Sequence, residues 1–577
     1  MKVLLVNPAC LDRRITDDDA RVVPIGLYYL AAQLLDSGVA AGIINLAGVA
    51  MDHDSNAPGA DDQASPAVAR TFQAALAQEK PDIVGFSVTN PSRFSAMACA
   101  RQTKALLPDA IVVFGGPAPT FMADHLFTAC PDLDIAVRGE AEQTLVQLVR
   151  AIEKNKHSPA ELTAIKGLVF RTGSGLEDTG LPDPIENLDH LARPSKYFAF
   201  QHLAMSRGCP GRCTFCGSPK FWGSGRVRRH SADWFFREIL ALNQQGISHF
   251  FISDDTFTMD RDAVIQLCKK IIESGLSITW NAISRVDYVD KGLLTAMRRA
   301  GCIQISFGVE SGDTGIRKTL GKPLDEAACV RAFDLTRSLG ILPRAYFIYG
   351  SPGETHETID QSIDLIKRLK PLGMVSYMLV VFPGTHLYTR ARDKKLVTDD
   401  IWFQRIEDLP WFELDPNLDF FGVKTFGDRL RQAFYATLSH AALSLELEDD
   451  KALYPFHADF LSRLAMTFSQ GEYADPVSDA RAVARQLFEQ ALAYAMDPRA
   501  CLGLSMIRQK DGDMPGAADL LEQGLKCFPG HRDLSVGMGV CLMNMGQFSQ
   551  ALDCFTPFDR DPSLRQYIDI CNSRITH

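Results

Sequence analysis

The chain has 577 residues, of which 46% are hydrophobic and 23% charged, a composition typical of a globular protein with several domains. Its 60 Lys and Arg against 70 Asp and Glu give a formal net charge of −10, so charge offers no general attraction to nucleic acid or an anionic membrane. No apolar run approaches the roughly 18 residues that span a bilayer, and Met1 to Asn7 is too short for a signal-peptide core, so we expect a cytoplasmic protein with reduced cysteines.

Apolar runs alternate with amphipathic helical patterns along the first 155 residues. Strands are predicted at 2–6, 43–44, 82–87, 111–114 and 135–140, with helices at 25–35, 68–78, 95–107 and 142–152. This alternation predicts a doubly wound parallel sheet, in which ligands bind beyond the carboxyl ends of the strands. Small or polar residues occupy those ends, namely Ser87, Thr89, Gly115 and Gly116.

Residues 156–195 are predicted to form a connector. The stretch 165–171 and the run rich in Gly, Asp and Pro up to Pro194 indicate a strand pair followed by turns. We therefore place a domain boundary near residue 195.

Three cysteines, Cys209, Cys213 and Cys216, follow with the spacing C-x3-C-x2-C on a loop that contains Gly and Pro. Cysteine thiolates on such loops hold iron–sulfur clusters, and three ligands leave one iron of a [4Fe–4S] cluster open. Structural zinc is the main alternative, but it takes four protein ligands, and the nearest further candidate, His230, is fourteen residues on. A disulfide framework fits poorly in a large chain without a secretion signal.

Together with Phe215, this spacing resembles the signature of the radical S-adenosylmethionine (SAM) superfamily. The resemblance implies that SAM chelates the open iron through its amino and carboxylate groups. Reductive cleavage of SAM then gives a 5′-deoxyadenosyl radical.

Residues 196–400 read as a repeating β/α unit with polar or glycine-rich turns after each strand. Strands are predicted at 250–253, 278–282, 303–308, 344–349 and 375–381. We expect a partial (β/α)6 barrel, as the resemblance also implies, with its chemistry at the carboxyl ends of the strands.

The residues at these strand ends suit SAM. Asp254 and Asp255 can accept hydrogen bonds from its ammonium group, and Glu310 from its ribose, while glycines permit close backbone approach. The family resemblance assigns the stretches around 308–312 and 348–354 to the SAM site. The candidate SAM residues are Phe215, Asp254, Asp255, Ser306, Gly308, Glu310, Ile348, Gly350 and Glu354.

Two of these patterns have alternatives. Glu354 could equally begin a helix, where a carboxylate is favourable. The basic run Lys220, Arg226, Arg228 and Arg229 could bind a carboxylate or phosphate, or form a solvated loop.

The order of the first 155 residues, closed by Arg138-Gly139-Glu140, resembles the cobalamin-binding domain that precedes many radical SAM domains. The resemblance implies that the turns at Ser87/Thr89 and Gly115/Gly116 accommodate the nucleotide tail of cobalamin. The motif Asp-x-His-x-x-Gly, which supplies a cobalt ligand, is absent, and His53 has the wrong spacing. We therefore expect cobalamin to bind without a histidine on cobalt; the alternative is a sheet that binds no cofactor and acts as a cap.

Beyond residue 400 we expect a helical extension over 401–475 and repeats over 476–577. Gly512 and Gly546 are 34 residues apart, as are Ala517 and Ala551, and Leu521 and Phe555. This period resembles tetratricopeptide repeats, which present a concave face to protein partners. The alternative is that the repeats only cap the catalytic domain.

The leading hypothesis is a cobalamin-dependent radical SAM enzyme that methylates an unactivated carbon or phosphorus of a small molecule. A radical cyclase or rearrangement enzyme is the alternative within the class. A methylthiotransferase would need a second cluster, and Cys10, Cys99 and Cys130 lack the spacing for one. A non-catalytic repeat scaffold is the fourth alternative. The class implies an electron donor such as flavodoxin or ferredoxin, and the sequence assigns no catalytic residue or substrate.

Overall fold

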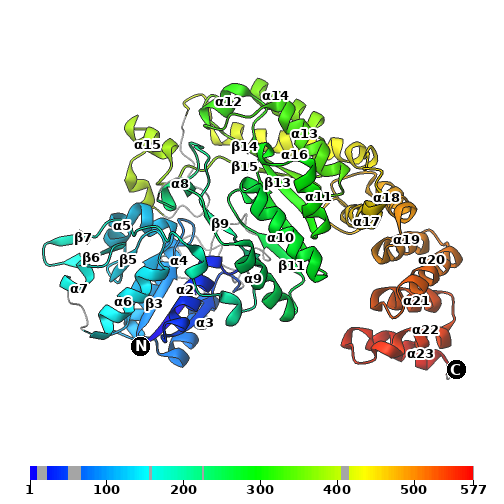
Figure 1. The fold of residues 1–577 in the computed structure, drawn as a ribbon, viewed down its shortest axis with the longest axis horizontal. Helices are drawn as coiled ribbons and strands as arrows, with labels where there is room; N and C mark the ends of the chain where they lie inside the picture. Colours follow the sequence, from blue (N-terminus) through cyan, green and yellow to red (C-terminus); the bar gives the residue numbers. More distant parts are fainter. Residues whose placement is uncertain (10–21, 50–65, 155–158, 224–225, 405–414, 576–577) are drawn as a thin grey trace.

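The computed structural model describes residues 1–9, 22–49, 66–154, 159–223, 226–404 and 415–575. Along these residues the chain forms two sheets with parallel strands and then a long run of helices (Figure 1). This arrangement confirms the predicted α/β class with a helical C-terminal region.

The first sheet has seven strands. In spatial order they are β2 (Ala40–Asn45), β1 (Lys2–Asn7), β3 (Ile83–Ser87), β4 (Ile111–Gly115), β5 (Ile135–Val137), β6 (Leu168–Thr172) and β7 (Gly175–Asp178). The first five are parallel, whereas β6 and β7 pair antiparallel. The predicted strand pair therefore extends this sheet at one edge.

Helices cover both faces of the first sheet. They are α2 (Ile25–Asp36), α3 (Pro66–Glu79), α4 (Arg93–Leu106), α5 (Pro117–Ala129), α6 (Glu142–Lys154) and the short α7 (Pro159–Thr163). Apolar side chains of α2 and α6 bury one face, and those of α3, α4 and α5 bury the other. Helix α5 is absent from the sequence-based prediction because two prolines interrupt its pattern; Pro117 occupies the first turn, where proline is tolerated.

The second sheet has six parallel strands that neighbour one another in chain order. They are β8 (His202–Leu203), β11 (His249–Ile252), β12 (Thr279–Ser284), β13 (Cys302–Glu310), β14 (Leu342–Tyr349) and β15 (Gly373–Met378). A separate antiparallel pair, β9 (Ser206–Arg207) and β10 (Arg228–Arg229), lies beside β8 in the chain.

The helices between these strands follow the predicted β/α alternation. They are α8 (Ser218–Phe221), α9 (Ala232–Gln244), α10 (Arg261–Ser274), α11 (Lys291–Arg299), α12 (Thr314–Thr319), α13 (Glu326–Ser338), α14 (His356–Leu369) and α15 (His386–Asp393).

The C-terminal region is entirely helical in its described part. Its helices are α16 (Phe420–Leu443), α17 (Tyr454–Ser469), α18 (Ala480–Tyr494), α19 (Pro498–Lys510), α20 (Met514–Cys527), α21 (Arg532–Asn544), α22 (Phe548–Phe555) and α23 (Arg565–Ile575). The pairs α19/α20 and α21/α22 begin 34 residues apart, in the predicted register. They extend away from the rest of the molecule as an arm (Figure 1).

Helix α16 packs directly on the second sheet. A Cβ atom on Gly427 would lie 2.4 Å from the Tyr349 ring, and one on Gly350 would lie 2.7 Å from Val423. One apolar core accordingly runs from the second sheet into the C-terminal helices as far as Cys541.

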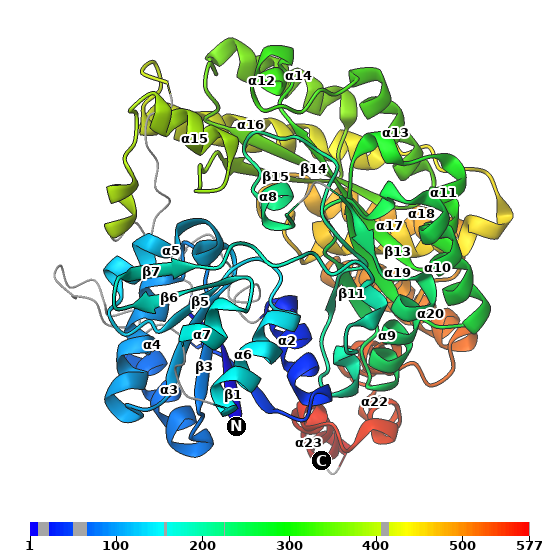
Figure 2. The same cartoon turned by 60° about the vertical axis from the view of Figure 1, so that its left-hand side comes forward.

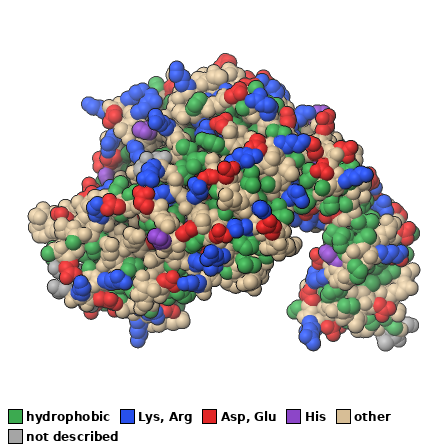
Figure 3. All heavy atoms as spheres, viewed as in Figure 1, with side chains coloured by type: hydrophobic (Ala, Val, Ile, Leu, Met, Phe, Trp, Pro, Cys, Tyr) green, Lys and Arg blue, Asp and Glu red, His purple; other side chains and the backbone are tan. Residues whose placement is uncertain are grey.

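The two sheets lie next to each other, with α8 between them and the C-terminal helices behind the second sheet (Figure 2). Acidic and basic side chains are interspersed over the face seen in Figure 3, and hydrophobic side chains gather on the C-terminal arm. None of the helices in the described ranges is long and apolar enough to cross a membrane.

Candidate active site

The three cysteines lie on the loop between β9 and α8, just beyond the first strand of the second sheet. Gly208 has a φ of +97°, and a Cβ atom there would lie 2.7 Å from the Arg226 carbonyl oxygen, so this position requires glycine. The Thr214 N–H donates to the Leu320 carbonyl at 2.9 Å, and the Leu387 N–H donates to the Thr214 carbonyl at 2.9 Å. The loop is therefore held at the carboxyl end of the sheet from both sides.

Cys209, Cys213 and Cys216 are partly exposed free thiols, close enough to influence one another electrostatically. The Gly211 N–H donates to the Cys209 sulfur at 3.4 Å, and a Cβ atom on Gly211 would lie 3.3 and 3.7 Å from the sulfurs of Cys209 and Cys213. Burial raises the pKa of the Cys216 thiol to about 11, and Asp255 and the other two cysteines raise it as well.

The surroundings of the cysteines suit an anionic cluster. Burial raises the pKa of Cys213, but the positive charges of Lys322 and Arg285 oppose this shift. Three thiolate donors, an N–H···S bond and two nearby cations are a donor set that fits a [4Fe–4S] cluster. Within the described ranges, no three Cys, His, Asp or Glu side chains are grouped closely enough to hold a single metal ion.

The two neighbouring aspartates after β11 lie in different surroundings. Asp254 is 2% exposed; it accepts hydrogen bonds from the Met205 N–H at 2.8 Å and from the Ser206 hydroxyl. Burial raises its pKa to about 6. Both of its oxygens thus hold the segment before the cysteine loop. Asp255 lies in the open space and accepts a hydrogen bond from the Ser218 hydroxyl at 2.5 Å.

Glu310 forms a buried ion pair with Lys322, with 2.6 Å between Oε1 and Nζ. Its backbone has a φ of +67°, an uncommon conformation for a residue with a side chain. A Cβ atom on Gly308 would overlap both members of the pair, at 2.2 Å from Nζ and 2.5 Å from Oε1. Gly308 therefore makes room for this ion pair.

Glu354 closes its own turn. Its Oε2 accepts hydrogen bonds from the N–H groups of Gly350 and Ser351, and its Oε1 is buried without a partner among the described residues. Burial raises the pKa of this carboxyl to about 7. Helix α14 is capped instead by Thr355, so Glu354 does not serve as the helix-starting residue that the sequence allowed.

The remaining SAM candidates lie around the same end of the sheet. Phe215, Ile348 and Phe382 are partly buried and pack against the same apolar cluster. Ser306 is buried within β13, opposite Arg344 of β14. The SAM assignments of all these residues remain predictions.

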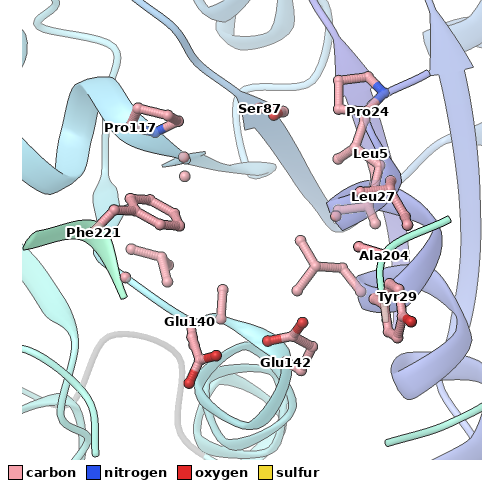
Figure 4. A pocket seen from close by; sticks show the side chains of 18 of the residues that line it. Leu5, Pro24, Leu27, Tyr29, Ser87, Pro117, Glu140, Glu142, Ala204 and Phe221 are labelled. Atoms are coloured by element: carbon pink, nitrogen blue, oxygen red, sulfur yellow. The ribbon is translucent and has the colours of Figure 1, made fainter. Parts of the chain in front are cut away.

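A cavity of about 480 Å³ opens at the carboxyl end of the first sheet (Figure 4). Ser87, Gly115 and Gly116 line it, together with the first turns of α2 and α6. Gly116 has a φ of +102°, and a Cβ atom there would lie 3.0 Å from the Val88 carbonyl oxygen, whereas Gly115 has ordinary room for one. These small residues leave the space open, which suits a bulky ligand tail.

A second cavity, of about 360 Å³, lies between the first sheet and the cysteine loop. Thr89 lines this cavity and not the first; its hydroxyl is 3.0 Å from that of Ser92, at the start of α4. Phe215 and Ser218 line it from the cysteine side, and Phe121 from α5. The two cavities share a wall formed by Pro117, Phe221, Trp222 and Asp255.

Sequence reasoning missed several charged residues at the larger cavity. Arg228, read as part of a basic run, is 5% exposed and paired with Glu140 at 2.6 Å. Arg207, Glu140 and Glu142 line the cavity itself. The closing Arg-Gly-Glu pattern pointed to this turn, but no local pattern indicated its partners.

Histidine positions bear on the expected cobalt coordination. His53 lies outside the described residues, so the expectation that it does not ligate cobalt remains a prediction. His202 lines the larger cavity, stacks on Phe251 with ring centres 4.7 Å apart, and has Nδ1 3.3 Å from the Ser253 hydroxyl.

Comparison with known families matches two parts of the chain. The model of the radical SAM superfamily matches residues 203–385, and that of the B12-binding domain matches residues 17–149. These ranges contain the cysteine loop and the larger cavity's glycine turns, respectively.

Related proteins match a little over half of the chain. An uncharacterised methyltransferase of Pyrococcus horikoshii is 32% identical over 334 residues, which cover 56% of this chain and 72% of the relative. An anaerobic magnesium-protoporphyrin IX monomethyl ester cyclase of Rubrivivax gelatinosus is 29% identical over 337 residues, covering 56% of this chain and 60% of the cyclase.

Among solved structures, the radical SAM methyltransferase TsrM of Kitasatospora setae, with cobalamin and a [4Fe–4S] cluster bound, superposes with a TM-score of 0.62. Its sequence identity is 16%, and the match covers 85% of this chain and all of TsrM. This likeness shows a shared fold.

Proposed function

Since the chain belongs to the radical SAM superfamily and carries a B12-binding domain before its radical SAM domain, we propose that it is a cobalamin-dependent methyltransferase acting on an unactivated carbon or phosphorus of a small molecule. The relatives named above as methyltransferases support methyl transfer as the reaction type.

The residues present fit the three cofactors. When bound, the [4Fe–4S] cluster supplies the electron for reductive cleavage of SAM, and cobalamin relays the methyl group. Cys209, Cys213 and Cys216 would hold the cluster, and the turns at Ser87, Gly115 and Gly116 would hold the corrinoid's nucleotide tail.

The chain's own residues prepare the site in two ways. Asp254 and the Thr214 contacts hold the cysteine loop in place. Phe121, Phe215, Phe221 and Trp222 give the smaller cavity apolar walls, which exclude water and so protect reactive species from side reactions.

One observation carries the proposal: the two cavities adjoin. Asp255, Phe221 and Trp222 line both, so a group bound at the first sheet and one bound at the cysteine loop would lie on opposite sides of one shared wall. Methyl relay between two cofactors requires such proximity.

The test is an anaerobic assay of the reconstituted full chain with SAM that carries a labelled methyl group. We expect the labelled methyl group on protein-bound cobalamin and, in the presence of a reductant, the formation of unlabelled 5′-deoxyadenosine. Protein prepared without cobalamin is the control and should yield no labelled corrinoid. Absence of label on retained cobalamin contradicts the proposal.

A radical cyclisation is the second candidate, favoured by the similarity to the anaerobic cyclase. It shares the SAM cleavage step but transfers no methyl group to the product. Once a substrate is found, a product without the label and without added methyl mass would favour the cyclase.

We further propose that the six-stranded sheet is a partial barrel and that α18–α23 are tetratricopeptide-like repeats. The 34-residue spacing of the helix pairs supports the second point. A protein partner would bind the arm, and flavodoxin or ferredoxin would deliver electrons in the cytoplasm.

A further inference from the structure

Four charged side chains form a buried network between the two sheets. Arg207 pairs with Glu140 at 3.0 Å through Nη1 and with Glu142 at 2.5 Å through Nη2, and Arg228 pairs with the other oxygen of Glu140 at 2.6 Å. Each of the four residues is less than 10% exposed. Although burial alone would raise the pKa of Glu140, the hydrogen bond from Arg228 and the charge of Arg207 hold it below its ordinary value.

The network joins two regions with different tasks. Glu140 lies between β5 and α6 of the first domain and Glu142 is the first residue of α6, whereas Arg207 and Arg228 are register partners in the β9/β10 pair that carries the cysteine loop. Arg207 precedes Cys209 by only two residues. The network is therefore a direct connection from the first sheet to the cysteines.

Glu140, Glu142 and Arg207 of this network also line one end of the larger cavity. Figure 4 shows Ser87 and Pro117 at one end of it and Glu140 and Glu142 at the other. The Arg207 guanidinium lies 5.3 Å from the Tyr29 ring centre and 5.4 Å from that of Trp222, which belongs to the wall shared by the two cavities. A ligand in the cavity would thus contact the groups that hold Arg207.

One acceptor in the network is unused. Glu142 Oε2 is buried and has no hydrogen-bond partner in the described part of the chain. A buried polar atom without a partner is costly, and a hydroxyl or amide group of a ligand in the cavity would satisfy it. Arg228 Nε and Nη2 are also buried without a partner among the described residues, but Arg228 does not line the cavity, whereas Glu142 does.

We infer that Glu142 and Arg207 are positioning residues that couple ligand binding in the larger cavity to the conformation of the cysteine loop. The inference rests on the proposed function, in which the ligand is a corrinoid whose nucleotide tail offers hydroxyl and amide donors. Because coupling between two sites is reciprocal, the corrinoid should stabilise the bound cluster by the same factor by which the cluster tightens corrinoid binding.

Two measurements on the anaerobic full chain test this coupling. The first is the equilibrium partition of iron between the reconstituted cluster and a ferrous chelator of known affinity, with and without saturating hydroxocobalamin. The second is the dissociation constant of hydroxocobalamin, from its visible spectrum, for cluster-loaded and cluster-free protein. For the wild-type chain we expect both ratios to be about tenfold, within the usual range of coupling between sites.

The variants Glu142→Gln and Arg207→Lys should bring both ratios close to one. The first replaces the unused acceptor by an amide and removes a charge; the second keeps the charge but cannot bridge two carboxylates with one planar group. Glu238→Gln is the matched control: Glu238 is also buried and pairs with Arg193 at 2.7 Å, yet it lies outside both cavities. It should keep the wild-type ratios.

The outcomes separate this inference from the proposed function. Wild-type chain that retains no corrinoid overturns both. Retained corrinoid with unchanged ratios in folded Glu142→Gln and Arg207→Lys protein overturns only the coupling. Equal loss of coupling in Glu238→Gln also overturns it, because the effect would then follow from any broken buried pair. Thermal unfolding of each variant verifies that it is folded.

Discussion

At the carboxyl ends of its strands, the first sheet presents Gly115, Gly116 and Ser87 around a large open cavity. At the corresponding ends, the second sheet presents cysteines and carboxylates, of which Asp254, Glu310 and Glu354 are already engaged by protein groups. Both ends belong to parallel sheets, where ligands are generally bound, but one end offers space and the other offers charge.

The difference separates two ways of binding a cofactor. A wide ligand needs backbone that stays out of its way, which small residues provide. A compact anionic cluster needs soft ligands and a fixed loop, which the cysteines and the buried Asp254 provide. A change at the first sheet should therefore act through volume, whereas a change at the second should act through ligand identity or charge.

The largest expected effect comes from removing the thiolates at the second sheet. Changing Cys209, Cys213 or Cys216 to Ala should abolish the oxygen-sensitive [4Fe–4S] cluster and all cleavage of SAM, because only two protein anchors remain. Iron and sulfide analysis of anaerobic protein measures this. Cys527→Ala, at an exposed cysteine on the arm, should load normally. Normal iron in the triple variant contradicts the assignment.

At the first sheet, we expect corrinoid binding to be lost when a larger side chain fills the cavity. Gly115→Leu should abolish corrinoid retention, since a Cβ atom fits there and the remaining side chain would enter the cavity. Gly116→Leu should do the same but adds backbone strain. Gel filtration after reconstitution with hydroxocobalamin, followed by the visible spectrum, is the measurement. Gly173→Leu, in open space between β6 and β7, should retain corrinoid. Equal retention by Gly115→Leu would show that the corrinoid does not bind in this cavity.

Buried charge at the second sheet should appear in the pH dependence of stability. Burial raises the pKa of Glu354 from 4.5 to about 7, so the folded state binds this proton more tightly than the unfolded state. Glu354 therefore costs stability increasingly as the pH rises from 4.5 to about 7. Glu354→Gln should be more stable than wild type above this range, by at most about 3 kcal/mol, and no more stable below it.

Urea unfolding across this pH range measures the effect. Glu357→Gln, at an exposed carboxyl in the next turn, is the control and should show no such gain. A constant difference between Glu354→Gln and wild type at all pH values would show that the Glu354 carboxyl does not titrate there.

SAM binding should depend on the carboxylate that remains in the open space. Asp255→Asn should weaken SAM binding by roughly 1.5–3 kcal/mol, the value of a hydrogen bond to a charged group, with the iron content unchanged. Glu310→Gln should also weaken it, but leaves buried Lys322 unpaired and so destabilises the fold. Equilibrium binding to cluster-loaded protein measures this, with Asp262→Asn as the exposed control. Unchanged affinity in both variants moves the SAM site elsewhere.

The smallest expected effect is at the histidines. We predict that cobalamin binds base-off with no histidine on cobalt, so His202→Ala and His53→Ala should leave the cobalt spectrum unchanged. His202 is already held by Phe251 and Ser253. A spectral shift in His202→Ala would identify it as a ligand from the second domain.

Local patterns predicted most of what each sheet contributes. The cysteine spacing, the glycine turns and the alternation of strands and helices are encoded within a few residues of one another. The sequence does not distinguish Asp254 from Asp255. Adjacent residues after a strand point to opposite sides, and only the fold shows which side is open. Arg207 and Glu140 are 67 residues apart and in different domains, so no local pattern relates them.

The contact of α16 with the second sheet limits how the chain can be divided. Gly427 lies against the Tyr349 ring and Val423 against the turn at Gly350. Tyr349, the last residue of β14, is therefore covered by α16, which begins at Phe420. A fragment ending at residue 400 would expose this apolar surface. A chimaera that transplants this active site into another scaffold must carry the chain to at least Leu443, and recombination points between homologues should fall beyond that helix.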